Sequence, residues 1–162
     1  MKILIAGATG RVGTLLTHDL LQDGHEIIVR ARHPERVGNN DRITPVKFDL
    51  HESVVEMTKA IKGSEAIYFT AGSGAKDLLQ VDAFDAVKLM QADKKDGIKR
   101  FVMLSALFSL EPTKWRTVKG LDGLTGYNIA KFFAGNYLIH DTDLDTPTNG
   151  NDRQAWYWQD HR

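Results

Sequence analysis

A tyrosine and a lysine stand four residues apart in the stretch Tyr127-Asn128-Ile129-Ala130-Lys131. Residues at this spacing share one face of a helix, so the phenol and the ammonium are expected to be neighbours. A nearby positive charge favours the phenolate, which lowers the pKa of a tyrosine from its ordinary value of about 10. Such a phenol can give a proton to a carbonyl oxygen as that carbonyl is reduced. The alternative is an ordinary solvent-facing pair on an exposed helix.

A serine ends the apolar run that precedes this helix. Ser105 follows Phe101-Val102-Met103-Leu104, which reads as a buried strand. A hydroxyl at that strand end can donate a hydrogen bond to a substrate oxygen. We therefore predict a catalytic set in which Tyr127 is the proton donor, Lys131 lowers its pKa and Ser105 positions the substrate.

Three glycines near the amino terminus have the spacing G-x-x-G-x-x-G. They follow the apolar run 3–6 and open the stretch 11–22, whose apolar residues recur at helical spacing. A strand, a glycine turn and a helix start in this order form an anion site, because the helix amides and dipole face the ligand. The prediction is a dinucleotide pyrophosphate site, and the alternative is a tight turn that needs glycine only for packing. The residues assigned to this loop are Gly7, Thr9, Gly10, Arg11, Val12 and Gly13.

The end of the second apolar run indicates which dinucleotide is bound. An NAD site usually has an acidic residue here, whereas this chain has Arg30 and Arg32. Guanidinium groups suit a 2′-phosphate, so NADP is favoured over NAD, and Arg11 could add a third positive group. The alternative is that these arginines are solvated surface charges. Asp49 could contact the adenine edge or only cap the following turn.

Apolar runs and amphipathic stretches alternate along the chain. The runs 3–6, 26–30, 43–48, 66–70 and 101–105 read as strands, and 11–22, 54–61, 76–96 and 127 to about 140 read as helices. This alternation predicts an α/β fold with a doubly wound parallel sheet (Rossmann) in the order 3-2-1-4-5. Ligands bind at the carboxyl edge of such a sheet, where Ala71 and Gly72 follow the fourth strand.

Bulk properties of the chain exclude several classes of protein. The 162 residues suit one domain. The 21 basic and 21 acidic residues give a formal net charge of zero, so the charge of the chain does not indicate binding to nucleic acid. There is no cysteine, and the six histidines have no metal-ligand spacing. Because Met1-Lys2-Ile3 runs straight into the first apolar run, we expect no signal peptide. No apolar run has membrane-spanning length, so we expect a cytoplasmic protein acting on a small molecule. The mixed charges of 88–100 predict a solvated helix face, and 108–126 reads as a loop, either a lid or a connector.

At these motifs the chain resembles the atypical short-chain dehydrogenase/reductases, and within them the NmrA-like group of small bacterial NAD(P)-binding oxidoreductases. The resemblance covers about residues 1–145 and includes the Val29-Arg30 strand end and Lys99-Arg100-Phe101-Val102. It implies that the three glycines bind pyrophosphate, that Arg30 and Arg32 bind the 2′-phosphate, and that Ser105, Tyr127 and Lys131 are catalytic. Some members of the group reduce quinones or flavins, and others only sense the NADPH/NADP ratio.

The chain departs from that family after residue 145. Residues 146–162 show no strand alternation and contain Trp156 and Trp158, where the family would continue into a sixth strand. We expect a Rossmann domain over 1–145 and an atypical tail over 146–162. Our hypothesis for the abrupt change at residue 146 is that the reading frame shifts or the gene is interrupted there. A disordered or docking tail is the alternative. The tryptophans could cover a sheet edge or pack against a second subunit in a homodimer.

Together these features predict an NADP-dependent oxidoreductase with a carbonyl, quinone or flavin acceptor. One alternative is an NADP-binding sensor or regulatory protein without turnover. Another is an epimerase or dehydratase, such as those acting on nucleotide sugars, that uses the same tyrosine.

Overall fold

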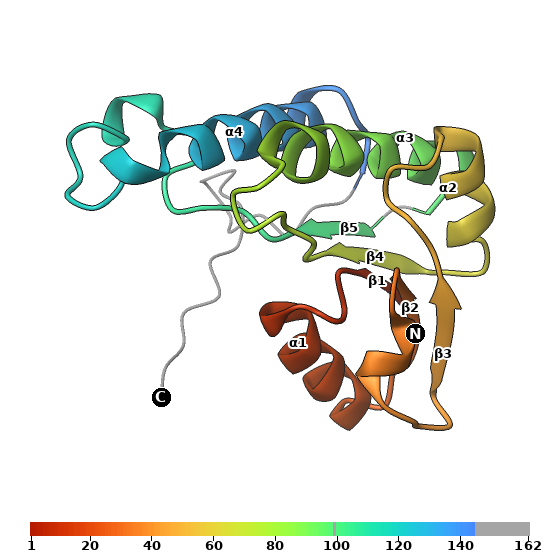
Figure 1. The fold of residues 1–162 in the computed structure, drawn as a ribbon. Coiled ribbons are helices and arrows are strands. Elements are labelled where there is room, and N and C mark those ends of the chain that lie inside the picture. The colour runs from red at the N-terminus through yellow and green to blue at the C-terminus, as the bar shows by residue number, and fades with distance from the viewer. Residues whose placement is uncertain (99, 145–162) are drawn as a thin grey trace.

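The computed structural model describes residues 1–98 and 100–144 and has a five-stranded parallel sheet at its centre (Figure 1). The strand order is β3-β2-β1-β4-β5, which confirms the predicted doubly wound sheet. The strands are β1 (Lys2–Ala6), β2 (Glu26–Ala31), β3 (Ile43–Lys47), β4 (Ala66–Phe69) and β5 (Arg100–Met103). Every neighbouring pair is parallel, so the carboxyl ends of all five strands lie at one edge.

The central strands are apolar because both of their faces are covered. Alternate residues of β1 point to opposite sides: Ile3 and Ile5 pack in one core cluster, and Leu4 and Ala6 pack in the other. Helix α1 (Arg11–Gln22) lies on one face of the sheet in Figure 1. The opposite face carries α2 (Val54–Ile61), α3 (Ala86–Asp96) and α4 (Thr125–His140). This layering explains why the strands show runs of apolar residues instead of alternation.

The predicted helix 76–96 is wrong in its first part. A π-helix, η2 (Leu78–Asp85), precedes α3, so the segment is two elements of different pitch. Asp82 and Asp85 on η2 are both buried and paired with groups from other segments. The amphipathic pattern of this stretch did not reveal the change of pitch, and π-turns often mark functional segments.

The expected solvated face over 88–100 is also wrong at its start. Lys88 is buried, and its ammonium donates hydrogen bonds to the carbonyls of Leu50 and Glu52 at 3.0 and 2.8 Å. The same ammonium lies 2.9 Å from Asp85. Lys88 therefore joins the loop after β3 to η2 instead of facing solvent.

The segment 108–126 contains two short 3-10 helices, η3 (Pro112–Lys114) and η4 (Asp122–Leu124). Trp115 between them is buried, donates its indole N–H to the carbonyl of Phe108 at 2.8 Å, and meets Phe132 of α4 edge-on at 5.9 Å. These contacts anchor the segment on α4. Within 1–98 and 100–144, no helix has the length and apolar character needed to cross a bilayer. The predicted tail, 146–162, lies outside the described residues.

Candidate functional site

Two of the three glycines in the amino-terminal loop are required by the packing of the chain itself. Gly7 has a φ of +92°, and a methyl group there would lie 2.5 Å from the backbone nitrogen of Ala71. A side chain at Gly13 would overlap the carbonyl oxygen of Gly7. The packing interpretation of the glycine motif is therefore correct at these two positions, which bring β1, α1 and the end of β4 into contact.

Gly10 differs from the other two glycines. It is exposed, its φ of −82° is open to any residue, and a methyl group would meet nothing nearer than the Gly7 carbonyl oxygen at 3.3 Å. It caps α1 without a side-chain hydrogen bond, so the amides of the first turn stay available. Thr9 and Arg11 beside it are also exposed, and Val12 is half-buried. An open glycine before uncapped helix amides fits the close approach of a pyrophosphate.

The two arginines at the end of β2 lie in different surroundings. Arg30 pairs in register with Ala6, the residue before the glycine loop, and is partly buried. Burial lowers the pKa of its guanidinium, and its buried Nε has no hydrogen-bond partner within the described residues. Arg32 is exposed. An orphaned guanidinium nitrogen beside the predicted pyrophosphate loop fits an anionic ligand group.

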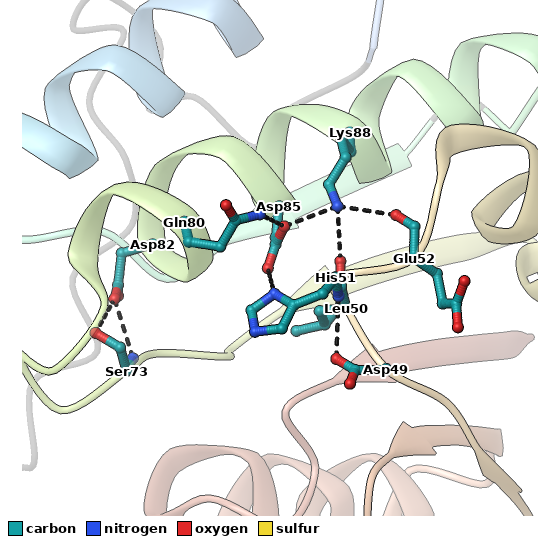
Figure 2. Close-up of polar contacts among 9 residues, drawn as sticks. All are labelled: Asp49, Leu50, His51, Glu52, Ser73, Gln80, Asp82, Asp85 and Lys88. Atoms are coloured by element: carbon teal, nitrogen blue, oxygen red, sulfur yellow. Dashed lines mark hydrogen bonds and ion pairs between the residues drawn. The ribbon is translucent and has the colours of Figure 1, made fainter.

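Asp49 acts as a turn cap in this structure. Its Oδ1 accepts the backbone N–H of His51 at 3.0 Å (Figure 2). Of the two roles that the sequence left open, the described contacts therefore support the cap. The side chain is exposed, which leaves the adenine-edge role untested.

The predicted pair of Tyr127 and Lys131 is brought together on α4. The Lys131 ammonium lies 5.5 Å from the Tyr127 ring centroid and 5.7 Å from that of Phe69 on β4. The lysine side chain is only 1% exposed, so the pair is no solvent-facing contact. Asp82 of η2, equally buried, lies 3.5 Å from the ammonium, which is an ion-pair distance longer than a close hydrogen bond.

The expected fall in the pKa of Tyr127 is not found in the ligand-free protein. Burial of the phenol raises its pKa, and the negative charge of Asp82 raises it further. Burial lowers the pKa of Lys131, and Asp82 opposes that fall. The prediction missed the burial of the phenol and, as a smaller effect, the negative charge of Asp82, which both raise its pKa.

Ser105 lies two residues beyond β5, and its hydroxyl is 2.8 Å from that of the buried Ser109. Its described hydrogen bond is to Ser109 and not to Tyr127 or Lys131. The structure thus joins two of the three predicted catalytic residues and leaves the third with a different partner.

Sequence reasoning missed Asp82 of η2, which is hydrogen-bonded to the loop after β4. The backbone N–H and hydroxyl of Ser73 both donate to Oδ2 of Asp82, at 3.0 and 2.7 Å (Figure 2). A methyl group at Gly72 would lie 3.2 Å from Oδ1 of the same carboxylate, and Ala71 lies against Gly7. The sequence signal for Asp82 was weak, since a lone acid in a helical stretch is usually solvated.

A metal centre finds no support in the part of the chain that the structure describes. No group of three or more histidine, aspartate or glutamate side chains there is arranged to hold a metal ion. Near Tyr127, Lys131 and Asp82 are ion-paired, whereas the buried side-chain amide of Asn128 has no hydrogen-bond partner within the described residues.

Comparison with known proteins agrees with this geometry. A family described as NAD(P)H-binding matches residues 7–146. The chain is 36% identical to a UPF0659 protein of Saccharomyces cerevisiae over 90% of its own length, and 35% identical to the uncharacterized sugar epimerase YhfK of Bacillus subtilis over 85%. It covers 66% and 65% of those relatives, just under two thirds of their length.

A solved structure is similar over the same region. The crystal structure of the oxidoreductase ylbE from Lactococcus lactis is 46% identical and superposes with a TM-score of 0.86, covering 90% of this chain and 66% of that one. The family match over residues 7–146 includes both the glycine loop and the helix that carries Tyr127 and Lys131. The chain therefore belongs to the NAD(P)H-binding family and has a Rossmann-like fold.

Proposed function

We propose that this protein is an NADP-dependent oxidoreductase that reduces a small carbonyl, quinone or flavin acceptor. The observation that carries the proposal is the buried ammonium of Lys131 beside the ring of Tyr127, in a chain of an NAD(P)H-binding family. Burying an ammonium costs folding free energy, and buried charged groups of this kind are concentrated at functional sites. The position of Lys131 beside a phenol therefore supports a role in proton transfer. Placement in the NmrA-like group and in the cytoplasm remains a prediction.

The residues that would hold the nucleotide fit its charged groups. The open backbone at Gly10 and the uncapped start of α1 would take the pyrophosphate, and Arg30 with Arg32 would take the 2′-phosphate. Arg11, exposed at the first turn, adds positive charge there. When bound, the reduced nicotinamide supplies a hydride.

Tyr127 would act as the proton donor to the acceptor oxygen. A phenol whose pKa is raised is fully protonated at neutral pH, as a proton donor must be. The positive charge of Lys131 would stabilise the phenolate left after that transfer. Ser105 would have to exchange its bond with Ser109 for one to the acceptor, which a rotating hydroxyl can do.

Replacing Arg32 with alanine is expected to weaken NADPH binding by about 10–100-fold and to leave NADH binding nearly unchanged. The lost interaction is a charge-assisted bond to the 2′-phosphate, a group that NADH lacks. Isothermal titration calorimetry with both nucleotides measures the two affinities.

Arg42→Ala is the matched control for this measurement. Arg42 is also exposed, but it lies just before β3. Its carbonyl accepts the N–H of Ile27 near the start of β2, which places Arg42 at the amino edge of the sheet, opposite to Arg32. It should bind both nucleotides like the wild type. Equal losses for NADPH and NADH in Arg32→Ala would argue against the 2′-phosphate role, and no binding of either by the wild type would refute the proposed function.

A second candidate function is that of an NADP-binding sensor without turnover. The bond between Ser105 and Ser109, in place of one near Tyr127, favours it. The name of the Bacillus subtilis relative, an uncharacterized sugar epimerase, favours the epimerase alternative. A sensor would bind NADPH but turn over no acceptor, and an epimerase would invert a sugar nucleotide without net oxidation.

A further inference from the structure

We propose that Asp82 is a positioning residue that holds the Lys131 ammonium beside Tyr127 and ties the loop after β4 to the same point. This inference deepens the proposed function and rests on it, because it concerns the surroundings of the proposed proton donor. Asp82 lies on the π-helix η2, outside every motif in the sequence.

The Asp82 carboxylate divides its two oxygens between two partners. Oδ2 accepts both the backbone N–H and the hydroxyl of Ser73, at 3.0 and 2.7 Å (Figure 2). Oδ1 faces the Lys131 ammonium at 3.5 Å. Because two donors from one residue hold Oδ2, the carboxylate cannot rotate freely, and the direction of Oδ1 is fixed.

Lys131 depends on this carboxylate for its charge. A buried ammonium is stable only when it is paired, and the rings of Phe69 and Tyr127 offer it only the weaker attraction of aromatic faces. In the described part of the chain, Asp82 is the one carboxylate ion-paired with Lys131. Asp82 therefore decides where the ammonium lies.

Asp82 also connects the Tyr127–Lys131 pair to the glycine loop, residues 7–13, through a series of contacts. Gly7 packs on the backbone of Thr70 and Ala71. Ser73, two residues further along, is bonded to Asp82. The chain of contacts thus runs from the glycine loop to the end of β4 and on to Lys131, with Asp82 at the join.

The test is Asp82→Asn in the full chain without ligand. Asparagine has the same shape, and its amide oxygen can still accept from Ser73, so the counter-charge of Lys131 is replaced by a neutral amide group. Phenol ionisation is followed by ultraviolet absorbance against pH, and the Tyr127 contribution is isolated by subtracting the same variant carrying Tyr127→Phe. The Tyr127 midpoint should fall by about one pH unit, because a negative neighbour has been lost.

Asp85→Asn is the matched control. Asp85 lies three residues further along η2, is as buried as Asp82, and is paired with its own lysine, Lys88. Its contacts are with His51, Gln80 and Lys88 (Figure 2). The Tyr127 midpoint should match that of the wild type. An unchanged midpoint in Asp82→Asn, or an equal shift in Asp85→Asn, would overturn the proposal.

A second pair of variants covers the case in which Asp82→Asn leaves Lys131 unpaired and fails to fold. Lys131→Met removes the buried charge that needs a partner and leaves the Asp82 carboxylate near the phenol. Adding Asp82→Asn to Lys131→Met should lower the Tyr127 midpoint by about one pH unit, and equal midpoints in these two variants would overturn the inference. Calorimetry with NADPH on the wild type tests the proposed function separately, because the titrations need no nucleotide.

Discussion

Replacing Gly7 with alanine is expected to lower the free energy of unfolding by about 2–5 kcal/mol. The φ of +92° disfavours any side chain, and the added methyl would lie 2.5 Å from the nitrogen of Ala71. The neighbour is the backbone just after β4, where the N–H of Thr70 donates to the carbonyl of Ala6 at 2.8 Å, so it cannot move aside without disturbing the end of the sheet. Since whole domains are stable by only about 5–15 kcal/mol, this variant should be close to unfolding at ambient temperature. Chemical denaturation followed by far-ultraviolet circular dichroism measures the change.

Gly10→Ala separates folding from binding within the same loop. Its methyl would be tolerated, with one contact at 3.3 Å and an ordinary φ, so the loss of stability should be under about 1 kcal/mol. Its affinity for NADPH should nevertheless fall strongly, because the methyl stands where the pyrophosphate approaches. If Gly7→Ala unfolds at the same denaturant concentration as Gly10→Ala, the packing role of Gly7 is refuted.

Replacing Tyr127 with phenylalanine should reduce turnover of the acceptor by about 10²–10⁴-fold while NADPH affinity is retained. The ring, and with it the contact with Lys131, is kept, and only the transferable proton is lost. Steady-state kinetics with quinone, flavin and aldehyde acceptors, together with calorimetry, give both quantities.

Tyr137→Phe is the control for this variant. Tyr137 lies on the same helix α4, is partly buried and packs against the core, so its replacement changes a phenol of similar environment. Its turnover should stay within about twofold of the wild type. Unchanged turnover in Tyr127→Phe would exclude the proton-donor role, and the absence of turnover in the wild type with every acceptor would favour the sensor.

The fold could be predicted from local features of the sequence. The runs that became β1 and β2 are apolar on both faces, and the stretches that became α1 and α2 end at Asp23-Gly24 and Lys62-Gly63. Each of these signals lies within a few residues of the element that it defines. The order of the strands then followed from the handedness of parallel connections.

The electrostatics of the site could not be predicted in the same way. The pairing of Asp82 with Lys131 joins residues on different helices, and that of Lys88 with the Leu50 and Glu52 carbonyls joins a helix to a distant loop. A sequence shows these residues only as charges in amphipathic stretches, for which the solvated position is the default expectation. The sequence correctly predicted that Lys131 lies beside Tyr127. It did not show that the phenol is buried and lies near Asp82, so the predicted fall in the pKa of Tyr127 was wrong.

The contact between Gly7 and the backbone of Ala71 limits how this protein can diversify. Two loops that touch through main-chain atoms leave no room for a side chain at Gly7, so this part of the proposed diphosphate cradle is closed to evolutionary change. The exposed stretch that begins at Arg32 has no such constraint. A lineage descended from this chain could therefore exchange one coenzyme for another at the end of β2 while the cradle stays the same.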